Sequence, residues 1–82
     1  MTHILVVDDE ASITDFLSLL FEGEGYDVAT ARSVEEARKG LETGSYDLVL
    51  CDIMMPDGNG LDLLKEIKAS EESPAVIMMT AY

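Results

Sequence analysis

Four oxygen-bearing side chains follow apolar runs that read as buried strands. Asp8 and Asp9 come directly after ILVV, Asp52 follows LVLC, and Thr80 follows AVIMM. Clustered carboxylates repel one another, and a hard divalent cation such as Mg²⁺ removes that cost while keeping room for waters and phosphate oxygens. A carboxylate nucleophile beside such a cation supplies the parts for phosphoryl transfer onto an aspartate. The hydroxyl of Thr80 is able to donate a hydrogen bond to a phosphoryl oxygen.

Four strands with three helical patterns between them would position these groups. The strands are expected at residues 3–8, 26–30, 46–51 and 75–79. All but the second are nearly continuous apolar runs, which is typical of parallel strands covered on both faces. The alternation predicts one α/β domain over residues 1–82, an open parallel sheet with flanking helices in the order β-α-β-α-β-α-β. In such a sheet ligands bind at the carboxyl ends of the strands, where the acids are expected to meet.

The helices are expected from apolar stripes and from capping residues. The first helix, over 10–24, should be ended by Gly25. Ser33 and Glu36 form a capping box for the second, and Asn59 or the glycine after it is placed to begin the third. The expected stripes are Ile13, Phe16, Leu17 and Leu20 in the first helix, Val34, Ala37 and Leu41 in the second, and Leu61, Leu64 and Ile67 in the third.

The composition excludes several classes of function. The chain has 82 residues with 17 acids against 5 bases, a formal net charge of −12. This balance argues against direct nucleic-acid binding, which needs a basic surface, and suits a divalent cation or a partner with a positive patch. No apolar run approaches the length of a membrane span. The single cysteine, Cys51, suits a reducing compartment, so we expect a cytoplasmic protein without membrane contact.

Plainer interpretations compete with the chemical ones. Asp8 and Asp9 could simply cap the first helix, where acids are favourable, and Thr80 could be an ordinary strand residue. The loop DIMMPDGNG does not match an EF-hand, because setting Gly58 as its invariant glycine puts Leu64 where the bidentate glutamate belongs. No cysteine and histidine pattern supports a zinc site.

The segments ILVVDDE, DLVLCDIMMPDGNGLDLL and AVIMMTAY, in this order and spacing, resemble the receiver domain of two-component response regulators. The ending TAY looks most like receivers of the nitrogen-regulator type. The resemblance spans the whole chain and implies a flavodoxin-like fold, with Asp52 accepting a phosphoryl group from a sensor histidine kinase and Thr80 as the switch hydroxyl. It implies that Met54 and Tyr82 tune hydrolysis of the acyl phosphate. The implied Mg²⁺ ligands are Asp8, Asp9, Asp52 and the backbone carbonyl of Met54.

The sequence also departs from that family. Receivers have five βα units, and no residues here correspond to the fourth helix, the fifth strand or the fifth helix. The family's active-site lysine and switch aromatic are absent with them, and Lys65 and Lys68 belong to the third expected helix. The last strand would then be an apolar edge, able to pair with another chain. We therefore expect either a fragment of a longer protein or a homodimer formed through Ile77, Met78 and Met79.

Three functions follow from these patterns. The first is a phosphoryl-accepting signalling domain, which is not an enzyme beyond Mg²⁺-dependent labelling and hydrolysis of its own aspartate. The second is a truncated receiver that serves as a self-associating module with phosphorylation lost or impaired. The third, a small phosphatase, is less well supported, because such enzymes need an acid two residues after the nucleophile. The candidate nucleophile, Asp52, is followed at that spacing by Met54. Asp8 is followed there by Glu10.

Overall fold

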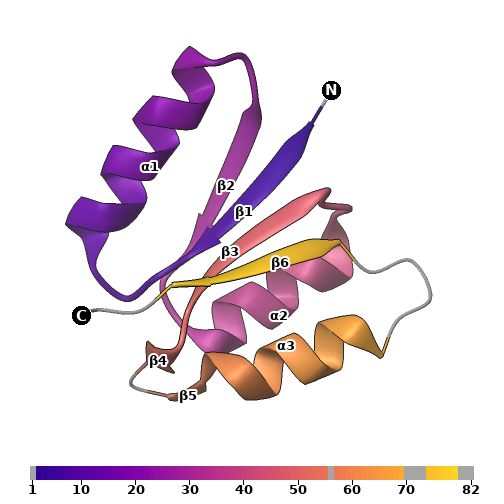
Figure 1. Cartoon of the computed structure of the whole chain (residues 1–82). Helices are drawn as coiled ribbons and strands as arrows, with labels where there is room; N and C mark the ends of the chain where they lie inside the picture. The colour runs from indigo at the N-terminus through magenta and orange to yellow at the C-terminus, as the bar shows by residue number, and fades with distance from the viewer. Residues whose placement is uncertain (1, 56, 70–73, 80–82) are drawn as a thin grey trace.

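The computed structural model describes residues 2–55, 57–69 and 74–79. Four strands form one parallel sheet in the order β2-β1-β3-β6 (Figure 1). A short antiparallel pair, β4 with β5, follows β3. The strands are β1 (His3–Val7), β2 (Asp27–Ala31), β3 (Leu48–Asp52), β4 (Met54–Met55), β5 (Gly58–Asn59) and β6 (Ala75–Met79). The predicted alternation and the open parallel sheet are confirmed.

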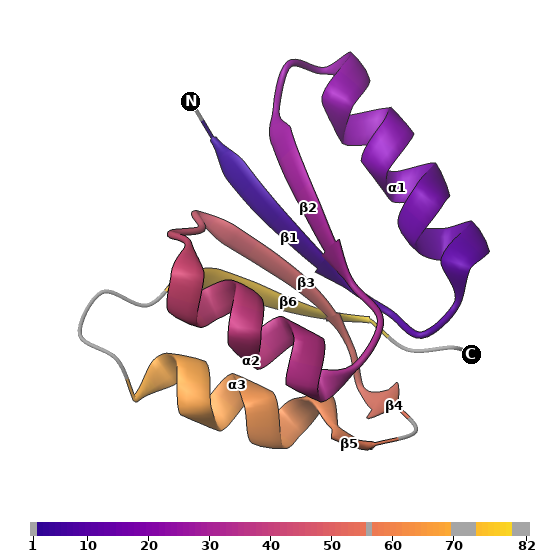
Figure 2. The same cartoon turned by 180° about the vertical axis from the view of Figure 1, so that it is seen from behind.

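The helices cover both faces of the sheet. Helix α1 (Ala11–Gly23) lies on one face, and α2 (Val34–Thr43) and α3 (Gly60–Lys68) lie side by side on the other (Figures 1 and 2). The larger buried cluster lies between the sheet and α2 with α3, and a smaller one lies under α1. Both faces of the central strands are therefore buried, which explains their uninterrupted apolar sequences. No helix in the described ranges is long and apolar enough to cross a membrane.

The predicted caps form where the sequence places them. Ser33 Oγ accepts a hydrogen bond from the Glu36 backbone N–H at 3.1 Å, and Asn59 Oδ1 accepts one from the Leu61 N–H at 2.7 Å. Gly25 has a φ of 92°, a conformation that glycine adopts without steric cost, and it follows the end of α1. The chain therefore leaves α1 through a turn that a side chain at this position would strain.

The third helix buries only part of the predicted stripe. Leu63 is 1% exposed and Ile67 is 6% exposed, whereas Leu61 is 44% exposed. The register is set at the start of the helix, where Gly60 lies against the Asp52 carbonyl and is itself buried. With residue 60 facing the sheet, the positions three and seven residues later face it too. The prediction for Leu61 was therefore wrong, and Leu63 was missed.

The predicted stripe of α1 is also only partly correct. Thr14 is buried and Leu17 packs against the core, but Phe16 is 65% exposed and Leu20 is 47% exposed. Ile13, at 37%, also lies at the surface. The helix contacts the sheet through a narrow line of residues. The other apolar residues of the predicted stripe, Ile13, Phe16 and Leu20, are not fully covered by any other part of the described chain.

Substituting the two leucines of α3 separately tests this register. We expect Leu63→Ala to lower the free energy of unfolding by about 2–5 kcal/mol, because it opens a cavity in the main core. Leu61→Ala should change it by about 0.5 kcal/mol or less, since nearly half of that residue is already exposed to solvent and it leaves no closed cavity. Urea unfolding followed by circular dichroism measures both, and equal losses would contradict the observed register.

Candidate functional site

The pairing of β1 with β3 brings two of the predicted acids together. Val7 and Cys51 are partners in the parallel register. In each case the next residue in the sequence is an aspartate, Asp8 after Val7 and Asp52 after Cys51. The Asp8 N–H still donates to the Ala31 carbonyl of β2 at 3.0 Å, so its backbone is held as firmly as the strand. Asp52 is the last residue of β3, one residue later than the predicted strand end. Both acids lie at the carboxyl edge of the sheet.

The three acids differ in exposure. Asp8 is 4% exposed and Asp52 is 9% exposed, while Asp9 lies in the bend after β1 and is solvent-exposed. Asp8 Oδ1 accepts a hydrogen bond from the Glu10 N–H at 3.0 Å, which shapes the turn into α1. The N-cap of α1 is Glu10 itself, and its side chain makes no capping hydrogen bond. Helix capping alone therefore does not account for this group of acids.

The carboxylates of Asp8, Asp9 and Asp52 form a close group. Each contributes an oxygen, and these oxygens all lie within 4.8 Å of one another. Two unit charges at this separation repel by about 3 kcal/mol at an effective dielectric constant of about 20. The pKa of Asp8 is raised, first by burial and then by the charges of Asp52 and Asp9, against the lowering effect of its hydrogen bond from the Glu10 N–H. The fold thus holds negative charges together at a cost.

This group of oxygens suits a hard divalent cation. A few carboxylate oxygens are the protein ligands that Mg²⁺ prefers, since it keeps several waters. Among the described residues, Asp8, Asp9 and Asp52 are the acids found close enough to share a metal ion. A bound cation would offset the repulsion within the group, so the residues present fit the predicted Mg²⁺.

The neighbouring thiol does not take part in this chemistry. Cys51 is 1% exposed, and its Sγ donates to the Asp52 carbonyl at 3.3 Å. Burial and the charges of Asp52 and Asp8 raise the pKa of Cys51 to about 11. The thiol is therefore protonated near neutral pH and is a poor nucleophile.

Three other predicted site residues are described in part or not at all. The backbone of Met54 belongs to β4, two residues after Asp52, but its side chain is not described. Met79 pairs with Asp52 in the register of β6 and β3, so β6 runs to the same edge of the sheet. Thr80, the next residue in sequence, and Tyr82 lie outside the described residues. Their predicted roles therefore stay predictions.

The structure adds Gly60 to the residues that shape the site. Its N–H donates to the Ile53 carbonyl at 2.6 Å, and a Cβ built on it would collide with the backbone carbonyl of Asp52. Only glycine allows the start of α3 to approach the phosphoacceptor candidate so closely. The glycine was predicted only as a possible helix cap, because nothing in a position eight residues after Asp52 indicates the contact.

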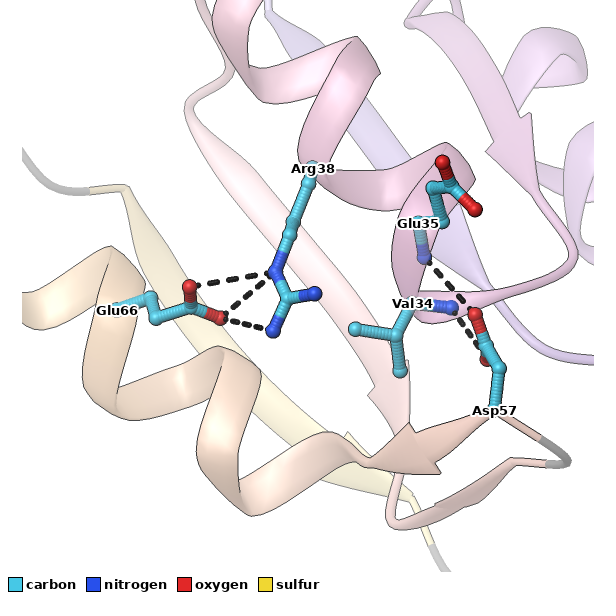
Figure 3. Close-up of polar contacts among 5 residues, drawn as sticks. All are labelled: Val34, Glu35, Arg38, Asp57 and Glu66. Carbon is cyan, nitrogen blue, oxygen red and sulfur yellow. Dashed lines mark hydrogen bonds and ion pairs between the residues drawn. The ribbon is translucent and has the colours of Figure 1, made fainter.

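A second residue of this kind is Asp57, in the loop DIMMPDGNG, which no sequence motif singled out. Its carboxylate accepts hydrogen bonds from the N–H groups of Val34 and Glu35, at 3.0 and 3.2 Å (Figure 3). These bonds lower the pKa of Asp57. The loop that follows Asp52 is thereby attached to the first turn of α2. No local pattern reveals this contact, because the partners are more than twenty residues apart.

A hollow of about 440 Å³ lies between α2 and α3, away from the acids. Its wall includes Arg38, Tyr46, Ile67 and Pro74. Tyr46 and Pro74 come just before β3 and β6, so the hollow lies toward the amino ends of these strands. None of the three clustered acids lines it, and the chemistry described above does not involve it.

Sequence comparison gives a family match over nearly the whole chain. The family model described as response regulator receiver domain matches residues 4–82. The transcriptional regulatory protein ZraR of Escherichia coli is 45% identical over 86 residues, covering 100% of this chain and 20% of ZraR. A CpxR homolog of Haemophilus influenzae is 48% identical over 81 residues, covering 99% of this chain and 35% of the relative. The chain thus spans about a fifth to a third of these relatives.

Solved structures give the same result. The response regulator TrrA of Thermotoga maritima, crystallised with Mg²⁺ and beryllium fluoride, superposes with a TM-score of 0.92 at 44% identity. That match covers 100% of this chain and 71% of TrrA. A CheY-like receiver domain protein of Methanospirillum hungatei gives a TM-score of 0.95 at 34% identity, covering 100% of this chain and 66% of the other. The β2-β1-β3-β6 sheet and its helices are therefore an arrangement shared with receiver domains.

Replacing Asp8 tests whether the acid group costs stability. In the folded chain the raised pKa means that ionised Asp8 is disfavoured, and this cost is present at neutral pH and disappears as the pH falls below its pKa. Asp8→Asn keeps the acceptor oxygen for the Glu10 N–H and removes the charge. We expect it to raise the unfolding free energy at pH 7 without Mg²⁺, and to reduce the stabilisation that Mg²⁺ gives to the wild type.

The matched control is Asp15→Asn, which removes the same formal charge from an exposed position on α1. Thermal unfolding of both variants, with and without Mg²⁺, provides the comparison. If the control gains as much stability as Asp8→Asn, the gain reflects the net charge of −12 and not the local cluster.

Proposed function

This chain belongs to the response regulator receiver domain family, and on that premise we propose that it accepts a phosphoryl group on Asp52 from the phosphohistidine of a sensor kinase. The observation that carries the proposal is the group of Asp8, Asp9 and Asp52 at the carboxyl edge of the sheet. The relatives named above are transcriptional regulators, and the chain covers only part of their length. Their output activity is therefore not assigned to it.

The proposed step uses the Asp52 carboxylate as nucleophile. One carboxylate oxygen forms a bond to phosphorus as the P–N bond to the donor imidazole breaks, and the imidazole nitrogen keeps the electron pair of that bond. Asp52 is fixed at the end of β3 by the strand register, and Gly60 lies against its carbonyl. The side chain is thus presented at a defined place on the sheet edge, which favours in-line attack.

Asp8 and Asp9, with Asp52 and the Met54 carbonyl, would hold Mg²⁺. When bound, the cation would neutralise charge on the transferred group. The buried Asp8 is held at the end of β1 by its backbone bond to Ala31 and by its side-chain bond to Glu10. Thr80 follows β6, which runs beside Asp52, and we assign it the switch hydroxyl. Lys65 and Lys68 occupy the last turn of α3 and do not enter the proposal.

The kinase partner would meet a strongly acidic chain. With a net charge of −12, contact with a basic surface is favoured and direct binding of nucleic acid by this segment is disfavoured. We place the reaction in the cytoplasm, where reducing conditions keep the buried Cys51 as a free thiol.

Phosphoramidate, a small phosphodonor with a P–N bond, tests the proposal without a kinase. Intact mass spectrometry should show the gain of one phosphoryl group in the presence of Mg²⁺ and none after its removal by chelation. Asp52→Ala should abolish the gain, because the proposal assigns Asp8 and Asp9 to the metal ion and Asp52 alone to the attack on phosphorus. Asp47→Ala, an exposed acid just before β3, is the matched control and should label like the wild type. Labelling of Asp52→Ala at the wild-type level would contradict the assignment.

A second candidate function, self-association, is favoured by the surface of β6. Among the described strands β6 pairs only with β3, and Ile77 on it is 52% exposed. Met79 packs with the smaller cluster under α1, and Ile77 shares its side of the strand. Phe16 and Leu20 belong to α1, the helix on this face of the sheet, and both are exposed. An apolar edge strand beside an uncovered helix flank favours pairing with a second copy, through Ile77, Met78 and Met79.

Replacing Ile77 by a charged residue separates this candidate from the first. If the chain forms a dimer through β6, Ile77→Glu should shift it to a monomer in analytical ultracentrifugation at micromolar concentration, with labelling on Asp52 retained. Leu61→Glu is the control, since Leu61 is exposed to a similar degree, 44%, on the opposite face. A wild-type chain that sediments as a monomer would rule out the self-association.

A further inference from the structure

We propose that Asp57 is a positioning residue that fastens the loop after Asp52 to the start of α2 and so places the Met54 carbonyl beside the acid group. The inference rests on the proposed function, because it assigns that carbonyl to the Mg²⁺ site. Residues 53–59 are called the β3–α3 loop below. The loop contains the antiparallel pair β4 and β5.

The contact itself uses both oxygens of the Asp57 carboxylate. Oδ1 accepts from the Val34 N–H at 3.0 Å and Oδ2 accepts from the Glu35 N–H at 3.2 Å (Figure 3). Two bonds to consecutive amides fix the orientation of the carboxylate as well as its distance. The negative charge also lies at the positive end of the α2 dipole, which strengthens the attachment.

The first amides of α2 are divided between two acceptors. Ser33 Oγ takes the Glu36 N–H at 3.1 Å, while Asp57 takes the Val34 and Glu35 N–H groups. The helix therefore carries an ordinary local cap and, in addition, a second cap supplied by a distant loop. The Ser33 cap alone would suffice to start the helix. We therefore assign the contact from Asp57 to holding the loop.

Met54 belongs to the hairpin that Asp57 attaches to α2, so the attachment also restrains the Met54 backbone. Met55 pairs with Gly58 and Met54 pairs with Asn59, so Asp57 lies in the turn of a short hairpin whose first strand contains Met54. At the base of the hairpin the Gly60 N–H donates to the Ile53 carbonyl at 2.6 Å. The hairpin is thus held at its base by Gly60 and at its turn by Asp57.

Close packing between the β3–α3 loop and α2 restricts where the loop backbone can lie. A Cβ built on Gly58 would lie 3.1 Å from Val34 Cγ2, which is tighter than an ordinary van der Waals contact. The backbone of the loop therefore lies directly against the first residue of α2. Met55, 8% exposed, adds its side chain to the main core. The loop is a packed element whose place depends on where α2 begins.

An exposed ion pair also connects α2 to α3. The Arg38 guanidinium donates to both carboxylate oxygens of Glu66, with Nη2 2.9 Å from Oε2 (Figure 3). The charge of Arg38 also contributes to lowering the pKa of Asp57, after its hydrogen bonds from Val34 and Glu35. The two helices that flank the loop are therefore joined to each other, and Asp57 joins the loop to that frame.

Two substitutions at the same helix end separate positioning from capping. Asp57→Ala removes the attachment of the loop, and Ser33→Ala removes the local cap of α2 but leaves the loop attached. Mg²⁺ affinity is measured by isothermal titration calorimetry, and exchange of the Gly60 amide is measured by NMR in the metal-free proteins. Asp57→Asn, which keeps one acceptor oxygen, is a milder variant should Asp57→Ala fold poorly.

We expect Asp57→Ala to weaken Mg²⁺ binding by about tenfold, as loss of an outer-shell partner does elsewhere, and to speed exchange of the Gly60 amide in the absence of metal. Asp57→Asn should give intermediate values. Ser33→Ala should lower thermal stability while leaving both quantities at the wild-type level. The inference is overturned if Asp57→Ala matches the wild type in amide exchange, or if Ser33→Ala produces the same loss of affinity.

The outcomes also distinguish the inference from the proposed function. If the wild type itself binds no Mg²⁺, the proposed function fails. The role of Asp57 in holding the loop is then still decided by the exchange of the Gly60 amide in the metal-free variants. If the wild type binds Mg²⁺ and both alanine variants bind it equally well, the function stands and the positioning role is excluded.

Discussion

The repulsion among three carboxylates at one edge of the sheet is the constraint on which the rest of the structure depends. Parallel pairing of β1 with β3 brings Asp8 and Asp52 together, and the pKa of Asp8 is raised first by burial and then by the neighbouring charges. The packing of both sheet faces must offset this cost, because isolated carboxylates would separate in water. A site that is unfavourable when empty is ready for a cation, and receiver domains share the fold that creates it.

Much of this arrangement could be predicted from the sequence, because continuous apolar runs and local capping residues determine it. The apolar runs ending in Asp8 and Asp52 indicated buried parallel strands, and a sheet of such strands brings acids together at its carboxyl edge. Capping by Ser33 and Asn59 could be predicted in the same way, because each side chain accepts a hydrogen bond from an amide only two or three residues away. These features are local, or follow from general rules of topology.

The features that could not be predicted depend on distant contacts. The stripe of α3 follows from the approach of Gly60 to the Asp52 carbonyl, which sequence spacing does not reveal, so Leu61 was chosen in place of Leu63. Asp57 looked like a turn residue because its partners belong to another helix. Both features act on the loop after Asp52, where strand, hairpin and helix join within a few residues. The acids themselves are thus readable from sequence, while the backbone that presents them is set by packing.

Binding of beryllium fluoride would test the central claim most directly, because TrrA was crystallised with Mg²⁺ and this phosphoryl-like group. Fluorine NMR detects it without a kinase and without turnover. A bound fluorine signal should appear only when Mg²⁺ is present and should vanish in Asp52→Ala, since the carboxylate and the metal site must act together. A bound signal that persists without Mg²⁺ or without the Asp52 carboxylate would show that the three acids do not form the phosphoryl-accepting site.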